Sequence, residues 1–479
     1  MKLTGLLSAA LLCLSLAAYA QRQRIDFDND WKFHFGHAAN AEKDFNYTIA
    51  NIFSKSGAAG STAINPRFDD SKWKTLNLPH DWAVDLPFVN VDNFDVMAHG
   101  YKPVGGLFPE TSIGWYRKHF LVAKEDSGQH IQLQFDGIFR DANIWVNGFY
   151  LGNNKSGYVG VAYDITDYVN FGKDNVVVVR ADASQYEGWF YEGAGIYRHV
   201  WLNKTNNLHI EQDGVFVYAD LKGDVATVTM ETAVQNKNLS ASNCSVYTYI
   251  ADRNGKKIVQ AKEQSVSLPV NGSVATKHIV AIGGARLWSL EDPYLYRVVS
   301  VIKQNGKVID SVKQRFGIRS IDIKPNGVFL NGKYIKLHGV NNHQDHAGVG
   351  SALPDYLQYY RIRLLKNMGV NAYRTSHNAP TPELLDACDS LGMLVLDENR
   401  LLNSSPEYMN QFERLIKRDR SRASVFMWSI GNEEGWIHTN SIGKRVAQTF
   451  IAKQKELDPT RTCTYAADVP NVFNARSQL

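Results

Sequence analysis

The feature that most constrains the fold is a regular alternation of strand-like and helix-like segments after Lys324-Pro-Asn-Gly327. The predicted strands are Tyr334–Val340, Val370–Arg374, Met393–Leu396, Val425–Ile430 and Thr462–Ala466. Strand, helix and strand in turn, joined by short loops, predict a parallel sheet covered by helices.

The helices between these strands carry clear start and stop signals. Thr381-Pro382 and Ser405-Pro406 each place a capping residue before a proline suited to the first helical position. Pro354–Met368 places apolar residues on one helical face, and Gly369 and Gly392 are expected to end their helices. The residues of that face are Leu357, Tyr360, Leu364, Leu365 and Met368.

A polar cluster follows each predicted strand. The clusters are Asn341-Asn342-His343, Ser376-His377-Asn378, Asp397-Glu398-Asn399, Asn432-Glu433-Glu434 and Asp468. In a (β/α)₈ TIM barrel all strand C-termini meet at the face that holds the active site, whereas a doubly wound sheet gathers only the loops at its switch point. The pattern therefore predicts a barrel. Since a barrel usually takes about 250 residues, we expect 321–479 to be a partial barrel, cut after about five strands.

Two β-rich domains are predicted before the barrel. Residues 25–205 contain strand-like runs separated by Asp136-Gly137 and Asn147-Gly148 turns, which favours a jelly-roll sandwich. Residues 206–320 contain shorter strands with turns at Asn254-Gly255 and Asn305-Gly306, which favours an immunoglobulin-like sandwich.

The N-terminus and the composition limit the location and the partners. Residues 1–20 combine Lys2, an apolar run and Ala18-Tyr-Ala20, as in a cleaved signal peptide. We therefore expect a periplasmic or extracellular protein that keeps no membrane segment after cleavage. The net charge of +4 leaves no basic face for nucleic acid. Cys244, Cys388 and Cys463 are too widely spaced for a disulfide framework or a zinc motif.

Glu433 is the strongest candidate catalytic residue. An apolar strand runs directly into Asn432-Glu433, and limited solvation near Trp428 would keep this carboxyl group partly protonated. A general acid that protonates a leaving glycosidic oxygen needs that property, and Asn432 would hydrogen-bond a sugar hydroxyl. Its neighbour Glu434 should point elsewhere, into a salt bridge or a supporting contact.

Long motifs in this chain resemble glycoside hydrolase family 2. Arg418–Glu433 is similar to the family's acid/base signature, and Asn371–Pro380 with Asp386–Asp389 to its second signature. Leu78–Trp82 and Gly193–Arg198 resemble its sugar-binding domain, and Leu287–Tyr294 its immunoglobulin-like domain.

The resemblance implies retaining hydrolysis of β-glycosides. It assigns Glu433 as acid/base, Asn432 as its companion, His343 and His377 to the sugar subsite, and Arg374 to orienting the carboxylates. Each histidine is about as often a structural hydrogen-bonding residue, and the arginine more often neutralises buried carboxylates. Asp397 and Glu398 are the candidates for that buried partner.

The catalytic nucleophile is expected to be absent from the chain. The family carries it after the seventh barrel strand, and Asp468 belongs to the fifth predicted strand. We therefore expect poor solubility and no turnover from 1–479 alone. A broken reading frame, a fragment and a remainder supplied elsewhere stay open, as do homo-oligomerisation and complementation by a C-terminal fragment.

No cofactor or catalytic metal is expected. His343 and His346 lack an obvious third ligand, and 399–405 lacks the acidic and histidine ligands with which some relatives bind magnesium. The favoured substrate is a β-linked oligosaccharide or glycoconjugate with a terminal β-D-galactoside, because the run Asn342–Gly350 looks most like exported β-galactosidases. Specificity for β-glucuronides or β-mannosides, a non-catalytic carbohydrate-binding role, and a purely structural or adhesive role are the alternatives.

Overall fold

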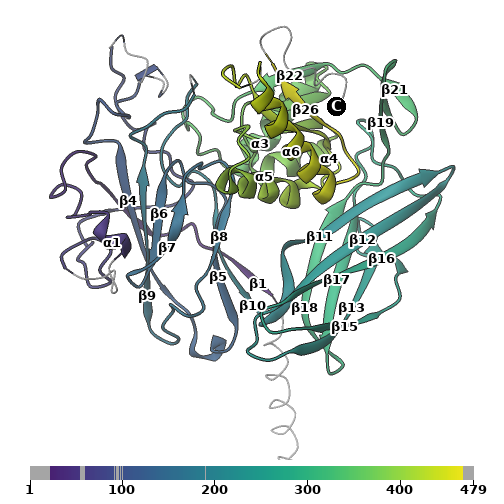
Figure 1. Cartoon of the computed structure of the whole chain (residues 1–479), viewed down its shortest axis with the longest axis horizontal. Coiled ribbons are helices and arrows are strands. Elements are labelled where there is room, and N and C mark those ends of the chain that lie inside the picture. Colours follow the sequence, from purple (N-terminus) through teal and green to yellow (C-terminus); the bar gives the residue numbers. More distant parts are fainter. Residues whose placement is uncertain are drawn as a thin grey trace, which may run out of the picture.

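The computed structural model describes residues 22–53, 60–90, 92, 96–97, 99, 101–188, 190–437 and 439–467. The predicted signal peptide and Asp468 lie outside the described residues. Figure 1 shows an N-terminal β-sandwich and a second β-sandwich on either side of an α/β unit that contains the C-terminal residues. Among the described residues, none of the helices combines the length and the apolar character that a membrane span requires.

The N-terminal domain is the predicted jelly-roll sandwich, with two antiparallel sheets. One sheet has the order β1 (Gln23–Asp26), β10 (Val200–Thr205), β5 (His130–Phe135), β8 (Val161–Asp164). The other has the order β3 (Lys74–Leu76), β2 (Trp31–Phe35), β4 (Ile113–Leu121), β9 (Asp174–Asp182), β6 (Ala142–Val146), β7 (Phe149–Asn154). Two short helices, α1 (Ala50–Phe53) and η1 (Lys124–Asp126), lie between strands. Leu133, Ile144 and Val179 are completely buried in the main core of the domain. Trp115, Trp145 and Val178 form a second buried cluster, so the sheet that contains β4, β6 and β9 is covered on both faces.

The second domain is an immunoglobulin-like sandwich. Its first sheet is β11 (Leu208–Lys222), β12 (Val225–Asn236), β16 (Ser273–Gly283). Its second sheet is β14 (Lys257–Gln260), β13 (Ser242–Ala251), β17 (Tyr296–Gln304), β18 (Lys307–Phe316), with β15 (Gln264–Leu268) also paired to β13. Cys244 is buried here as a free thiol, as are Cys388 and Cys463 in the α/β unit.

The α/β unit has the topology of a TIM barrel. Its parallel strands are β22 (Gly339–Asn342), β23 (Ala372–Thr375), β24 (Leu394–Glu398), β25 (Val425–Asn432) and β26 (Cys463–Ala466). The intervening helices are α3 (Asp355–Asn367), α4 (Pro382–Leu391), α5 (Pro406–Asp419) and α6 (Ser441–Leu457). The strands pair in chain order, and each neighbour is parallel. This sequential order has no switch point, so the described strands form part of a barrel.

The first strand of this unit was predicted wrongly. Instead of a strand over Tyr334–Val340, the chain forms the antiparallel strands β19 (Ile321–Lys324), β20 (Gly327–Leu330) and β21 (Lys333–Ile335), and the parallel sheet begins only at Gly339. Asn331 and Gly332 both have positive φ, at 52° and 75°, as a two-residue hairpin of type I′ requires. The Asn-Gly pair in the sequence is the signal for this hairpin.

The predicted apolar face of α3 is not the buried one. Gln358 and Ile362 are buried, whereas Tyr360, Leu364 and Met368 are 49%, 44% and 75% exposed. The helix packs beside α4, and Leu365 of the predicted face packs against the main hydrophobic core, so this face is covered only in part. Periodicity identified the helix correctly but gave no information on which side is covered.

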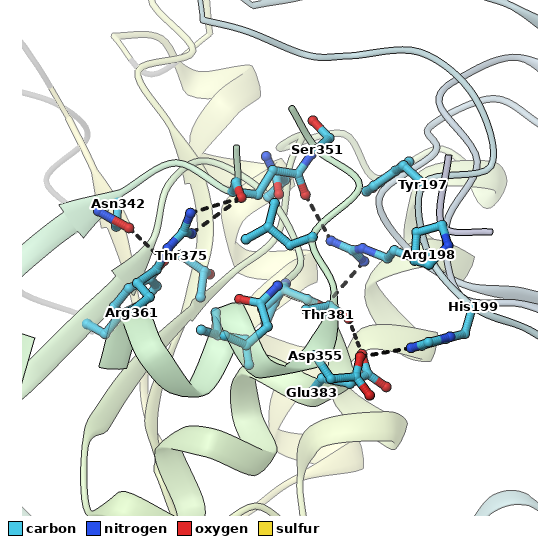
Figure 2. Close-up of a pocket in the computed structure, with 18 of the residues that line it drawn as sticks. Tyr197, Arg198, His199, Asn342, Ser351, Asp355, Arg361, Thr375, Thr381 and Glu383 are labelled. Carbon is cyan, nitrogen blue, oxygen red and sulfur yellow. Dashed lines mark hydrogen bonds and ion pairs between the residues drawn. The ribbon is translucent and has the colours of Figure 1, made fainter. Parts of the chain in front are cut away.

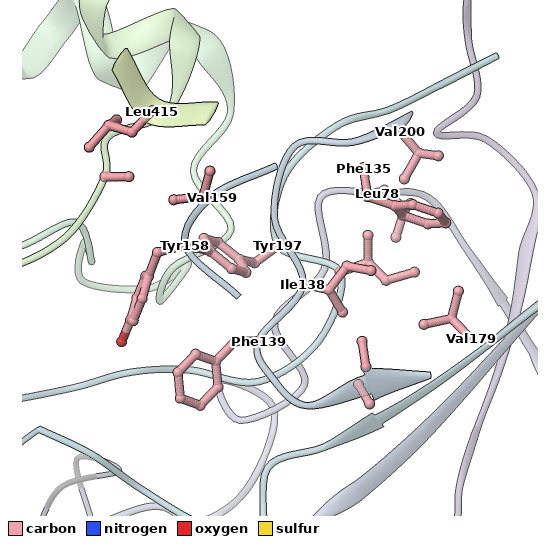
Figure 3. Close-up of a cluster of buried hydrophobic side chains, with 14 of the residues drawn as sticks. Leu78, Phe135, Ile138, Phe139, Tyr158, Val159, Val179, Tyr197, Val200 and Leu415 are labelled. Atoms are coloured by element: carbon pink, nitrogen blue, oxygen red, sulfur yellow. The ribbon is translucent and has the colours of Figure 1, made fainter. Parts of the chain in front are cut away.

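The jelly roll and the α/β unit share one continuous hydrophobic core. Tyr158, Val159 and Tyr197 of the jelly roll belong to the same buried cluster as Leu415 of α5. Figure 3 shows Leu415 facing Val159 across this boundary. We call this boundary the seam. Its apolar packing holds the jelly roll in a fixed position against the α/β unit.

Candidate active site

A buried carboxylate at the end of β24 organises the C-terminal edge of the parallel sheet. Glu398 is completely buried and accepts hydrogen bonds from Arg374 Nε at 2.7 Å and from Ser429 Oγ at 2.7 Å. His377 Nδ1 lies 2.9 Å from its other carboxylate oxygen. A buried charge needs such partners to offset its lost hydration. Glu398 is thus the buried carboxylate that the sequence pairs with the arginine.

Arg374 extends this network to the next strand. One of its terminal nitrogens donates to Asn432 Oδ1 at 2.7 Å, while the same guanidinium is paired with Glu398. The contact fixes the Asn432 amide at the end of β25 and turns its Nδ2 donor away from the arginine. The arginine therefore connects the ends of β23, β24 and β25.

Glu433 follows directly, in an unusual backbone conformation. Its φ is +52°, in the left-handed region that costs a non-glycine residue about 1–2 kcal/mol. Its N–H donates to Ala466 O at 2.9 Å, and its carbonyl accepts from Gly435 N at 2.8 Å. These bonds hold the turn, and functional sites are where such strained residues are concentrated.

The described residues do not provide the limited solvation expected for Glu433. Its side chain is exposed. Trp428, expected to shield it, is completely buried and donates from Nε1 to Asp458 at 2.9 Å. The indole of Trp428 thus packs inside the α/β unit and does not shield Glu433 from water.

The other two acidic candidates are supporting residues. Glu434 accepts from Leu402 N at 3.1 Å, and its own N–H donates to Tyr465 Oη at 2.6 Å, so it fixes the loop after β24. Asp397 is completely buried, and burial, reinforced by the charge of Asp419, raises its pKa well above the usual value. Asp397 therefore faces α5 rather than the site.

His343 and His377 lie together, beside an aromatic residue that sequence reasoning missed. Their ring centroids are 5.3 Å apart, and Phe190 of the jelly roll lies 4.5 Å from the His343 ring. Burial, with a smaller effect of His377, lowers the pKa of His343. A neutral imidazole beside an aromatic ring suits the recognition of a sugar through hydroxyl contacts and stacking. His346, by contrast, places Nδ1 2.9 Å from the carbonyl of Ala347.

A charged contact holds the Phe190 loop against the α/β unit. Arg400, which follows β24, pairs with Glu187 at 2.5 Å, and Arg140 pairs with Glu187 at 3.0 Å. The Arg400 guanidinium also lies 5.4 Å from the Phe190 ring. The acidic and aromatic residues just before Gly193–Arg198 were the available sequence signal for this loop.

The two jelly-roll motifs noted in the sequence lie at the seam. Arg198 donates to Ala379 O at 2.8 Å and to Gln344 Oε1 at 3.0 Å. Asp81 accepts from Ala194 N and from Ser351 N, both at 2.9 Å. These bonds fix the loops after β22 and β23, which carry His343 and His377.

A small cavity at the seam lies beside this site (Figure 2). Its volume of about 30 Å³ suits one or two water molecules rather than a sugar. Asn342, Thr375 and Arg198 line it, but Glu433, His343 and His377 do not. The candidate sugar site is thus the open end of the sheet, not this cavity.

The sequence matches three family descriptions that together cover the three domains. "Glycosyl hydrolases family 2, sugar binding domain" matches 73–206, "Glycosyl hydrolases family 2" matches 208–319, and "Glycosyl hydrolases family 2, TIM barrel domain" matches 321–478.

Individual relatives agree with these matches. The Bacteroides ovatus protein named Beta-galactosidase BoGH2A is 31% identical over 96% of this chain and 56% of its own length. A Formosa agariphila protein named Beta-glucuronidase is 31% identical over 89% of this chain and 45% of its own length. The chain thus spans about half the length of these curated relatives.

A solved structure shares the arrangement of the domains. A glycosyl hydrolase family 2 member from Bacteroides cellulosilyticus superimposes with a TM-score of 0.82 and 34% identity, over 94% of this chain and 57% of the other. The curated relatives that it matches include proteins named as a β-galactosidase and a β-glucuronidase. Domain order, partial-barrel topology and sequence all agree with the family descriptions, and the chain belongs to glycosyl hydrolase family 2.

Proposed function

We propose that this chain carries the acid/base half of a retaining β-glycosidase that removes terminal β-D-galactose from an exported oligosaccharide or glycoconjugate. The observation that carries the proposal is the pair of contacts made by Arg374. Its guanidinium pairs with Glu398 and donates a hydrogen bond to Asn432 Oδ1 at 2.7 Å. Asn432 directly precedes Glu433 at the end of the strand. The acid/base step needs a carboxyl group held in a fixed position beside the hydrogen-bonding groups that orient the sugar.

In the first step, the nucleophilic carboxylate forms a bond to C1 while the bond from C1 to the glycosidic oxygen breaks, and Glu433 gives its proton to that oxygen, which leaves as the aglycone hydroxyl. In the second step, the resulting Glu433 carboxylate takes a proton from a water molecule that attacks C1, and the bond from C1 to the nucleophile breaks, which releases the sugar and the free nucleophile. Asn432 donates to the sugar 2-hydroxyl, while His343 and His377 contact further hydroxyls. The Phe190 ring forms the jelly-roll side of the subsite.

Retention requires a second carboxylate about 5–5.5 Å from the acid/base. We place this nucleophile on polypeptide that completes the sheet beyond β26, either as continuing chain or as a complementing fragment. In the described sheet β22 and β26 are edge strands, whose unpaired backbone N–H and C=O groups can bind a further strand, and this supports the assignment. On this proposal, 1–479 alone catalyses no turnover.

The preference for galactosides rests on the β-galactosidase relative, whose similarity covers 96% of this chain. The β-glucuronidase relatives make glucuronides the competing substrate class. The signal-like sequence at 1–20 supports action after export.

The test compares the chain alone with a fusion. The fusion joins this chain to the C-terminal part of the Bacteroides ovatus relative that follows the aligned region. We expect the chain alone to leave aryl β-D-galactosides intact and the fusion to hydrolyse them in preference to aryl β-D-glucuronides. Turnover by the chain alone, or a preference for glucuronides, would contradict the corresponding part of the proposal.

The role of Glu433 has its own diagnostic. In a Glu433→Ala fusion, substrates with poor leaving groups should lose activity much more than dinitrophenyl galactosides, which need no protonation. Added azide should restore turnover and give β-galactosyl azide, because the small anion replaces water that needs a general base. Equal losses for both leaving groups would assign Glu433 another role, and Glu407→Gln, on the exposed first turn of α5, is the matched control.

A further inference from the structure

A histidine and two carboxylates from different domains converge at the cavity in the seam. His199 belongs to the jelly roll, Asp355 begins α3, and Glu383 lies in the first turn of α4. One ligand atom from each lies within 4.8 Å of the other two. Figure 2 shows the three side chains together beside the water-sized cavity, whose lining includes all of them.

The imidazole of His199 is held in a fixed orientation. Its Nδ1 lies 2.5 Å from Asp28 Oδ2, and the other oxygen of Asp28 accepts from Val200 N at 2.8 Å. The ring therefore directs Nε2 toward Asp355 Oδ1, 2.9 Å away. A carboxylate that fixes one ring nitrogen while the other faces further ligands is the usual support for a metal-binding histidine.

The charges around the cluster favour a cation. Asp28, Asp355 and Glu383 are three carboxyl groups around one imidazole. The guanidinium of Arg198, which lines the same cavity, is engaged by the carbonyls of Ala379 and Tyr158. A bound dication would offset the negative charge of these carboxylates.

The three ligand atoms need to move only a little to bind one metal ion. Ligand atoms bound to one metal at about 2.1 Å are about 3–4 Å apart, so closure of the cluster requires a carboxylate shift of about one ångström. Asp355 and Glu383 sit at the starts of two helices packed side by side, so their Cα positions are fixed, and only side-chain rotation is needed.

We propose that His199 Nε2 and one carboxylate oxygen each from Asp355 and Glu383 bind a divalent transition-metal ion that links the jelly roll to the α/β unit. One imidazole and two carboxylates form a ligand set for Zn²⁺ or Mn²⁺, whereas Ca²⁺ and Mg²⁺ prefer oxygen ligands alone. Water from the adjoining cavity completes the coordination. The ion takes the place of the proton that bridges His199 and Asp355 in the metal-free protein.

The test titrates the EDTA-treated chain with Mn²⁺ by calorimetry and follows bound Mn²⁺ by pulsed electron paramagnetic resonance. We expect one saturable site per chain, nitrogen coupling from one imidazole, and a thermal midpoint that rises with Mn²⁺ concentration. The measurement of metal binding does not depend on glycosidase activity. If the proposed glycosidase function proves wrong, the test of the metal site is therefore unaffected.

Variants distinguish this site from adventitious binding. Asp355→Asn and Glu383→Gln should each weaken binding at least about tenfold, and Asp28→Asn by about 10- to 100-fold. Asp322→Asn, at an exposed position in β19, is the matched control and should change nothing. Wild-type binding weaker than about 1 mM, unchanged affinity in the Asp355→Asn/Glu383→Gln double variant, or tighter binding of Ca²⁺ than of Mn²⁺ would each overturn the proposal.

Discussion

Arg198 of the jelly roll donates a hydrogen bond to the carbonyl oxygen of Ala379 in the α/β unit, at 2.8 Å. Ala379 lies two residues after His377, in the loop that follows β23. A residue in the first domain thus determines where a candidate sugar-contacting histidine of the third domain lies.

Replacing Arg198 should destabilise the seam. Arg198→Met leaves the buried carbonyls of Ala379 and Tyr158 without their donor, so we expect a loss of about 3 kcal/mol or more in the free energy of unfolding. Urea unfolding followed by tryptophan fluorescence measures this loss. Arg253→Met, at an exposed site in the second domain, is the control; equal stability of the two variants would show that the seam contact is not stabilising.

Glu398→Gln should disturb the catalytic geometry without opening a cavity. The amide keeps the size of the side chain but removes the charge that pairs with Arg374 and His377. We expect kcat of the fused enzyme to fall about 100-fold, since small displacements at a catalytic site have effects of that size. Steady-state kinetics on an aryl galactoside checks this, with Glu407→Gln as control; an unchanged kcat would mean that Arg374 holds Asn432 without the charge of Glu398.

Phe190→Leu should change substrate binding more than chemistry. Leucine keeps the apolar contact with His343 but removes the aromatic face, which contributes about 0.5–1.5 kcal/mol in such pairs. We expect KM of the fused enzyme to rise about 2- to 10-fold and kcat to change little. Phe149→Leu, on the exposed jelly-roll surface, provides the comparison. A fall in kcat at constant KM would place Phe190 in positioning rather than binding.

Stability should depend on pH through Glu192, a buried residue of the Phe190 loop. Burial, with a contribution from Glu187, raises the pKa of Glu192 from 4.5 to about 8. Between these values the folded state keeps a proton that the unfolded state releases, so this contribution to stability falls as pH rises.

The Glu192→Gln variant isolates that effect. Its amide still accepts the backbone N–H of Gly188, which Glu192 accepts at 3.0 Å. The free energy of unfolding of the variant relative to wild type should therefore increase between about pH 5 and about pH 8. Urea unfolding at both pH values provides the measurement, and Glu125→Gln, at an exposed position, should show no such trend. A difference that stays constant with pH would contradict the assignment.

Local sequence signals were sufficient for the strand that carries Glu433. The run after Val425 is apolar and ends in Asn432-Glu433, and the order of strands and helices implied that these residues share an edge with His377. The same reasoning failed at Asn331-Gly332, where a hairpin signal was present but unused. It also failed at α3, because periodicity shows that a stripe is apolar but not what covers it.

The seam was beyond sequence reasoning for a different reason. Arg198 and Ala379 are 181 residues apart, and Phe190 meets His343 only where the jelly roll packs against the α/β unit. No periodicity or spacing records such a contact, since it depends on the relative position of whole domains. The motif Gly193–Arg198 was recognised in the sequence, but nothing in the sequence indicated that it contacts the α/β unit.

The shared core also has a consequence for how the chain is made. Tyr197 precedes Leu415 by 218 residues (415 − 197), although both belong to one buried cluster. At a synthesis rate of about 5–20 residues per second, the jelly-roll sequence exists for about 10–40 s before its apolar partner. During that interval Tyr158, Val159 and Tyr197 lack the α5 contacts that bury them in the folded protein, so apolar surface is open to association with other unfinished chains.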